Sequence, residues 1–144
     1  MRKIDSFWDS SALVPLCVEQ RPSAVARAAI QSRSITIWWS TPVEITSAFA
    51  RLLRNGEISR SDFEKAVNRL QALEGRWAEV LPTARLRELA RTLIQKHPLR
   101  AADGLQLAAA LVWCRERPAK RPLVCLDGPL AEAARSEGFQ VEAL

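Results

Sequence analysis

The stretch PLVCLDGPLAEAARSEGFQVEAL, residues Pro122–Leu144, decides the fold class. Its first part, PLVCLD, is a short apolar run that ends at an aspartate and predicts a strand. The following PLAEAARSEG predicts a helix, and FQVEAL predicts a final strand. A strand, a helix and a strand in this order form a βαβ unit, and such units build parallel sheets with helices on both faces.

The same alternation of short apolar runs and helical patterns fills the rest of the chain. We expect one domain over residues 1–144, with an α/β fold in three α/β/α layers around a mainly parallel central sheet. The other expected strands are Lys3–Asp9, Ile35–Trp39 and a short one within Trp77–Pro82. The expected helices are Ser11–Val18 (broken or bent at Pro15), Pro22–Ser32, Thr41–Gly56, Ser61–Gly75, Thr83–Lys96, Leu99–Cys114 and Pro129–Gly138.

Two of these helices begin with recognisable capping signals. Thr41 is expected as an N-cap, Pro42 as the first helical residue and Glu44 as the partner in a capping box. Ser61 and Glu64 predict the same arrangement for the next helix.

The composition describes a chain that folds around a core. Of its 144 residues, 48% are hydrophobic and 26% charged, which is typical of a globular domain. No apolar run reaches the ~18 residues of a membrane span, and Asp5 and Asp9 interrupt the N-terminal segment, which argues against a signal peptide. We therefore expect a cytoplasmic protein with no membrane partner. The 3 cysteines show no CxxC spacing and are expected to be reduced and mostly buried.

The formal net charge of +5 comes mainly from arginine. Arginine suits bidentate contacts with phosphate, but a basic balance alone also describes an ordinary solvated surface. The charge therefore leaves nucleic-acid binding open.

A carboxylate stands out in the apolar segment LRAADGLQLAAALVWC, residues Leu99–Cys114. A helix that is apolar on most faces is buried, and an unpaired buried charge is costly. Asp103 and Gln106 are three residues apart and so share one face of this helix. That face must therefore meet something polar.

Three further acids share this setting at a helix start: Asp9, Glu44 and Asp127. For each one alone, capping a helix is a sufficient explanation. Asp9 and Asp127 also end predicted parallel strands, so they belong to the same edge of the sheet, where such folds bind ligands. Ionised carboxylates this close repel one another, and oxygen ligands without His or thiolate suit Mg²⁺ or Mn²⁺. Such a cation can activate water for attack on a phosphodiester.

Four stretches in this order resemble the signatures of PIN domains: DSSALVPL, TPVEITSAFAR, LRAADGLQLAAAL and VCLDGPLAEAARSEGFQV. Their order and spacing are most similar to those of the VapC-type toxin ribonucleases of VapBC toxin–antitoxin pairs. The resemblance implies an Mg²⁺- or Mn²⁺-dependent endoribonuclease that acts on RNA, forms a homodimer and is inhibited by a cognate VapB-type antitoxin. It assigns the metal and catalytic site to Asp9, Glu44, Asp103 and Asp127.

The resemblance also assigns supporting roles to two neighbours of these acids. Ser11 matches a small hydroxyl residue that can hydrogen-bond a carboxylate or a coordinated water. Cys125 stands where such toxins usually carry Ser or Thr, and a thiol is a weak donor. This difference motivates the alternative that the chain is a non-catalytic RNA-binding or regulatory PIN-like module. A phospho-aspartate receiver domain would carry an adjacent pair of acids near its first strand and a lysine after a late strand. Here the first strand ends in the single Asp9, and no lysine follows the PLVCLD strand, so this class is disfavoured.

Two further features allow either a structural or a binding role. Trp38 and Trp39 end a predicted strand and face opposite sides, so one is expected in the core while the other could stack on a base or lie in a dimer interface. The helix Thr83–Lys96 carries several cations that predict a solvated face rather than an RNA track: Arg85, Arg87, Arg91 and Lys96.

Overall fold

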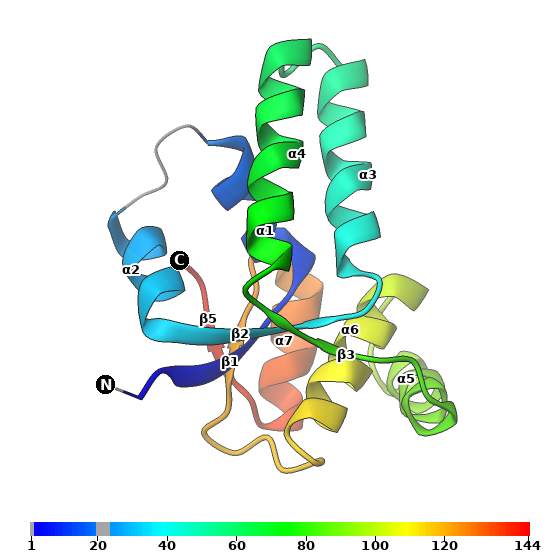
Figure 1. Cartoon of the computed structure of the whole chain (residues 1–144). Coiled ribbons are helices and arrows are strands. Elements are labelled where there is room, and N and C mark those ends of the chain that lie inside the picture. Colours follow the sequence, from blue (N-terminus) through cyan, green and yellow to red (C-terminus); the bar gives the residue numbers. More distant parts are fainter. Residues whose placement is uncertain (1, 20–23) are drawn as a thin grey trace.

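A single parallel sheet organises the residues that the computed structural model describes, 2–19 and 24–144 (Figure 1). Within them the sheet has five strands in the order β3-β2-β1-β4-β5, and every neighbouring pair is parallel. The predicted parallel α/β sheet is thus confirmed. The strands are β1 (Ile4–Trp8), β2 (Arg33–Trp38), β3 (Ala78–Val80), β4 (Pro122–Val124) and β5 (Gln140–Glu142).

Helices cover both faces of this sheet, which gives the expected three layers. Phe7 and Trp8 are neighbours on β1 and enter two different hydrophobic clusters, because successive strand residues point to opposite faces. The Trp8 side packs against α1 (Ser10–Val18), α2 (Ala24–Ser32), α3 (Thr41–Arg54) and α4 (Arg60–Glu74). The Phe7 side packs against α5 (Ala84–Lys96), α6 (Ala101–Trp113) and α7 (Gly128–Glu137).

The chain reverses its direction across the sheet at β1. From β1 it proceeds outward through β2 to β3, and then crosses back to β4 on the other side of β1. The carboxyl ends of β1 and β4 therefore flank a topological switch point, which is where open parallel sheets bind ligands. Asp9 directly follows β1, and Asp127 follows β4 after two intervening residues.

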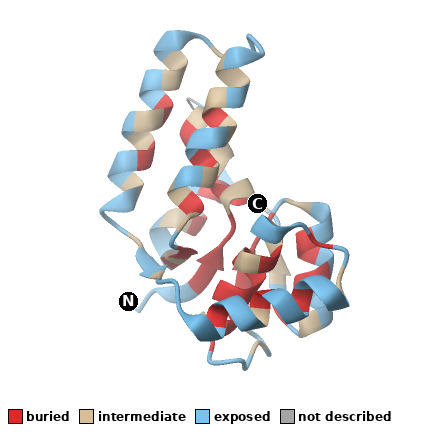
Figure 2. Cartoon of the chain, turned by 90° about the vertical axis from the view of Figure 1, so that its right-hand side faces the viewer, coloured by how far each residue is buried: buried red, intermediate tan, exposed pale blue. Residues whose placement is uncertain are grey.

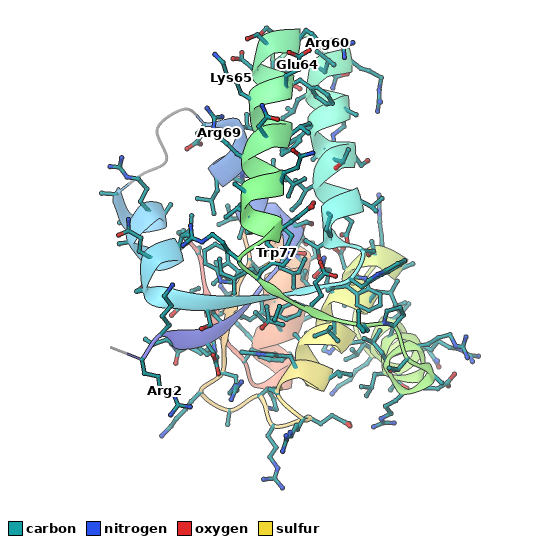
Figure 3. The ribbon with its side chains drawn as sticks, viewed as in Figure 1. Arg2, Arg60, Glu64, Lys65, Arg69 and Trp77 are labelled. Carbon is teal, nitrogen blue, oxygen red and sulfur yellow. The ribbon has the colours of Figure 1, made fainter. Side chains whose placement is uncertain are left out.

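The antiparallel helices α3 and α4 extend away from the sheet as an arm (Figure 1). Near the sheet this arm is anchored by the buried Ile45 and Phe49, whereas its far end is exposed or half-buried (Figure 2). The Arg69 side chain on α4 points toward α1, where its guanidinium donates a hydrogen bond of 2.6 Å to the Cys17 carbonyl (Figure 3). The arm and α1 are therefore held together on one side of the sheet.

The predicted starts of α3 and α4 are wrong by one or two residues. The N-cap of α3 is Ser40, so Thr41 lies inside the helix and is buried, and Pro42 follows it. Thr41 instead accepts a hydrogen bond from Gln106, a contact between distant segments that local capping rules do not include. The N-cap of α4 is Ser59 rather than Ser61.

The capping box of α4 pairs Ser59 with Asp62 instead of Ser61 with Glu64. The sequence SRSDFE contains two overlapping copies of the same signal, and the structure uses the earlier one. In α3, the Glu44 carboxylate forms no capping box and is directed to other partners, as described below.

Helix α1 is not broken at Pro15, and the Glu19 N–H bonds to the Pro15 carbonyl at its end. The predicted start of α2 at Pro22 lies outside the described residues. The three cysteines are free and buried, as expected. Among the described residues, no helix is both long enough and apolar enough to cross a bilayer.

Candidate acidic site

Asp9 is the most deeply buried acid, with 3% of its surface exposed. It follows the central strand β1 and is the N-cap of α1, where its Oδ2 accepts a hydrogen bond of 3.1 Å from the Ser11 backbone N–H. Burial raises the pKa of the Asp9 carboxyl, and the charge of Asp127 raises it further. Backbone and side-chain hydrogen bonds from Ser11 act in the opposite direction. The sequence therefore places a carboxylate where its ionised form is costly.

Ser11 and Cys125 link Asp9 to the segment that follows β4. The Ser11 hydroxyl accepts a hydrogen bond of 2.9 Å from the Leu126 N–H and lies 3.8 Å from the Cys125 sulfur. That sulfur lies 3.8 Å from Asp9 Oδ2. Burial, followed by the charge of Asp9, raises the pKa of the Cys125 thiol to about 12. Cys125 therefore stays protonated, and its single weak S–H donor is divided between Asp9 and the Asp127 carbonyl, which lies 3.4 Å from the sulfur.

Glu44 reaches the site from the first turn of α3. Its Oε2 accepts hydrogen bonds from the Gln106 amide at 3.0 Å and from the Ser40 hydroxyl at 3.3 Å, and its Oε1 lies 3.5 Å from the Ser10 hydroxyl. Burial raises the pKa of Glu44 to about 7, and the charges of Asp9 and Asp103 contribute to this rise. Three separate elements thus hold a carboxyl group that can change its protonation near neutral pH.

Asp103 enters from the first turn of α6 and is half-buried. Burial raises its pKa to about 6, with further contributions from the charges of Asp127 and Asp9. Arg100, the N-cap residue of α6, lowers this pKa in part. Asp103 therefore faces the other acids rather than the apolar core.

Asp127 joins the site as the N-cap of α7, where its Oδ2 accepts a hydrogen bond of 3.0 Å from the Leu130 N–H. Capping and ligand binding are compatible, because a carboxylate has two oxygens with about four lone-pair sites. The two explanations for Asp9 and Asp127, helix cap and site residue, therefore do not compete.

The four acids form one electrostatic group: the charges of Asp9, Asp103 and Asp127 each raise the pKa of at least one other member, and the pKa of Glu44 is raised by two of them. Within the described parts of the chain, none of the four forms an ion pair. Nor do any three His, Cys, Asp or Glu side chains there form a preassembled metal-binding group. The donor set nevertheless has the hard-oxygen chemistry that Mg²⁺ and Mn²⁺ prefer, and a bound cation would relieve the mutual repulsion. Side-chain movement would be needed to bring the oxygens together.

Sequence reasoning missed two residues that bond to Glu44, Ser10 and Ser40, and the role of Thr41, which accepts from Gln106. Their hydroxyls gave no signal, because serine and threonine near a helix start are typical caps. Gln106 was identifiable from its helical spacing to Asp103, and the structure confirms that this face of α6 meets polar groups.

A cleft of about 580 Å³ opens beside Glu44, between α1 and α3. Its polar lining includes Ser10, Ser11 and Ser47, and Arg51 contributes the cation. It is continuous with the acidic site, because Glu44 is itself part of the lining.

Trp38 is buried and Trp39 is 53% exposed, as expected for neighbours on a strand. Arg85, Arg91 and Lys96 each lie in an ion pair on or near α5, which agrees with a solvated face. These features do not contribute to the acidic site.

No family model matches the sequence, and no curated protein matches it. Solved structures do match across nearly the whole chain. A chain of VapBC2 from Rickettsia felis, crystallised with a DNA fragment from its promoter, has a TM-score of 0.69 and 12% identity over 98% of this chain and 99% of that one. PAE2754 from Pyrobaculum aerophilum has a TM-score of 0.65 and 19% identity over 97% of this chain and 89% of that one.

FitAcB from Neisseria gonorrhoeae has a TM-score of 0.62 and 16% identity over 94% of each chain. A toxin-antitoxin complex from Klebsiella pneumoniae has a TM-score of 0.59 and 16% identity over 85% of this chain and 86% of that one. These neighbours share the fold that the resemblance implies. The chain therefore has the α/β fold found in solved structures of toxin–antitoxin proteins.

Proposed function

We propose that this protein is a metal-dependent endoribonuclease and the toxin of a toxin–antitoxin pair. The observation that carries the proposal is the convergence of Asp9, Glu44, Asp103 and Asp127 from four separate elements beside the switch point of the sheet. Helix capping does not explain the whole group, because Glu44 and Asp103 cap no helix with their side chains. A group that destabilises its own ionised forms is instead typical of a functional site.

Mg²⁺ or Mn²⁺ would supply activation of water and stabilisation of the charge that develops on the phosphodiester. The residues of this chain determine where that chemistry takes place. Asp9 and Asp127 are fixed by the backbone N–H groups of α1 and α7, so their oxygens have defined positions on either side of the crevice. Asp103 completes the group from α6.

Glu44 is suited to handle a proton. Its pKa of about 7 in the metal-free protein means that its carboxyl group gains or loses a proton around neutrality. Cation binding requires the ionised carboxylate, so binding and proton release are coupled. Gln106 supports the ionised form by donating to Oε2.

The proposed partners follow from the neighbours and the resemblance. Several matching structures are toxin–antitoxin complexes, so a VapB-type antitoxin is the expected inhibitor. An RNA substrate, a homodimeric state and a cytoplasmic location complete the proposal.

The decisive experiment compares RNA cleavage by the wild type, Asp9→Asn and Asp103→Asn with Mg²⁺ or Mn²⁺. Asp5→Asn is the matched control, because Asp5 is an exposed acid on β1 outside the site. We expect the wild type and the control to cleave, the two site variants to lose cleavage, and EDTA to abolish it. Equal cleavage by all four proteins, with no effect of EDTA, would contradict the proposal.

The same panel tests the alternative of a non-catalytic RNA-binding or regulatory module, which Cys125 motivates. Tight RNA binding that needs no metal, with no cleavage across a broad set of RNAs, would favour the alternative.

The toxin assignment is tested separately, by the growth of cells that express the protein. Expression should arrest growth, and Asp9→Asn should relieve the arrest.

A further inference from the structure

The cleft between α1 and α3 extends the acidic site in one direction. Glu44 marks the end nearest the sheet, and Arg51 lies further along α3 toward the far end of the arm. Seven residues separate them, which corresponds to a rise of about 10 Å along a helix. Arg51 therefore lies about two helical turns beyond Glu44 in the same cleft.

The walls of the cleft combine hydroxyl groups with apolar surface. Ser10 and Ser11 on α1 face Ser47 on α3. The Ser10 and Ser11 hydroxyls are directed to Glu44 and Cys125, and the Ser47 hydroxyl can donate to an anionic oxygen. Val14 and Pro15 add apolar surface on the α1 side. Such a lining suits a chain that alternates anionic and apolar groups.

Arg51 is a free cation among the described residues. Its side chain is exposed, and no ion pair there includes it. Arg85 and Arg91, by contrast, are paired with carboxylates on the opposite side of the sheet. Arg51 is therefore the cation best placed to meet an anion that leaves the acidic site through the cleft.

We propose that this cleft binds the single-stranded RNA backbone beside the cut, with the Arg51 guanidinium on a phosphate that flanks the cleaved one. The inference rests on the proposed ribonuclease function and specifies where one flank of its substrate lies. An RNA cut within the chain must continue beyond the acids, and the cleft is continuous with them through Glu44. Arginine's planar fork binds phosphate oxygens in pairs.

The test measures binding of an unstructured oligoribonucleotide in a divalent-free buffer, where the proposed cleavage does not occur. Arg51→Gln is compared with Arg54→Gln, a matched control in the same last turn of α3, exposed and equally without an ion pair in the described chain. Both changes remove one cation near the same helix end, so both change the helix stability alike. A urea unfolding midpoint checks that both variants remain folded.

We expect Arg51→Gln to raise the Kd for RNA about tenfold. The slope of log K against log salt should become shallower by about 0.7, the value for one lost phosphate contact on a single strand. Arg54→Gln should retain the wild-type slope. Shortening the RNA on the flank that occupies the cleft should abolish the difference between wild type and Arg51→Gln.

Failure of this inference and failure of the proposed function give different results. If the wild type cleaves RNA but the two arginine variants share one Kd and one salt slope, the cleft assignment is overturned and the ribonuclease stands. That result would favour a protein segment, rather than RNA, as the ligand of the cleft. If the Arg51→Gln slope changes but no RNA is cleaved, the RNA-binding cleft is supported and the catalytic proposal fails.

Discussion

The Gln106 amide nitrogen lies 3.0 Å from Glu44 Oε2 and 2.9 Å from the Thr41 hydroxyl, which joins the middle of α6 to the start of α3. Gln106 is buried, with 1% of its surface exposed. It stands one helical turn after Asp103, so one face of α6 both supplies an acid and orients another. The polar face of an otherwise apolar helix is thus explained by the site that it supports.

Replacing Gln106 with methionine should destabilise the protein and raise the pKa of Glu44 above about 7. Methionine has a similar volume but no donor, so the ionised carboxylate loses its amide partner. A hydrogen bond to a charged group contributes about 1.5–3 kcal/mol. The loss in unfolding free energy should therefore be larger at about pH 8, where Glu44 is ionised, than at about pH 5.

Urea unfolding at the two pH values measures this effect, and carboxyl carbon chemical shifts report the pKa. Leu105→Met on the neighbouring position of α6 serves as a control for introducing methionine. An equal loss at both pH values would show that Gln106 acts by packing alone.

The metal-free protein should lose stability as the pH rises from about 4 to about 7. Asp103 and Glu44 have pKa values raised from 3.8 to about 6 and from 4.5 to about 7. In this window the unfolded chain has released these protons while the folded chain still holds them. The unfolded state therefore binds fewer protons, and the free energy of unfolding falls with increasing pH.

Unfolding midpoints across this pH range, with and without Mg²⁺ or Mn²⁺, check the prediction. Glu44→Gln should flatten the upper part of the curve, since it removes the group that titrates there. A divalent cation at about 100 times its Kd should restore about 2.7 kcal/mol near neutral pH. A metal-free curve that rises through this window would contradict the raised pKa values.

The sequence was sufficient to predict the parallel sheet, its flanking helices and the shared setting of the four acids. These features follow from local patterns: apolar runs, helical periodicity and acids at helix starts. The proximity of Asp9 and Asp127 followed from one further rule, that parallel strands end at the same edge.

The helix starts and the support of Glu44 could not be predicted in the same way. Thr41 carries the sequence signature of an N-cap, yet its hydroxyl is used by Gln106, which is 65 residues away. Glu44 similarly accepts from the Gln106 amide as well as from the Ser40 hydroxyl, instead of closing a capping box with the backbone N–H of its helix start. In both cases a contact between distant segments replaces a local one, and one sequence does not reveal which contact prevails.

Gly104 should resist replacement by alanine because α5 and α6 approach closely at this point. A Cβ at Gly104 would lie 2.6 Å from Ile94 Cγ1 and 2.8 Å from Ile94 Cδ1. Overpacking of this kind costs about 1–3 kcal/mol, partly offset by about 1 kcal/mol from the better helix propensity of alanine.

Thermal or urea unfolding of Gly104→Ala, Ile94→Ala and the double variant measures this relationship. The double variant should be more stable than the sum of the two single changes predicts, because removing the Ile94 side chain gives the new methyl group room. Strict additivity would mean that contact with Ile94 does not cause the destabilisation by Gly104→Ala.

Cys125→Ser should strengthen the support of Asp9 and lower its pKa. A hydroxyl is a stronger donor than the thiol that now lies 3.8 Å from Asp9 Oδ2. Because a cation requires ionised ligands, Mn²⁺ or Mg²⁺ should then stabilise the protein at lower concentrations, an effect largest at acidic pH. Cys125→Ala is the matched control: it removes the donor altogether and should shift the metal dependence of the unfolding midpoint in the opposite direction. If the serine and alanine variants share one metal titration curve, the side chain at this position does not support Asp9 through a hydrogen bond.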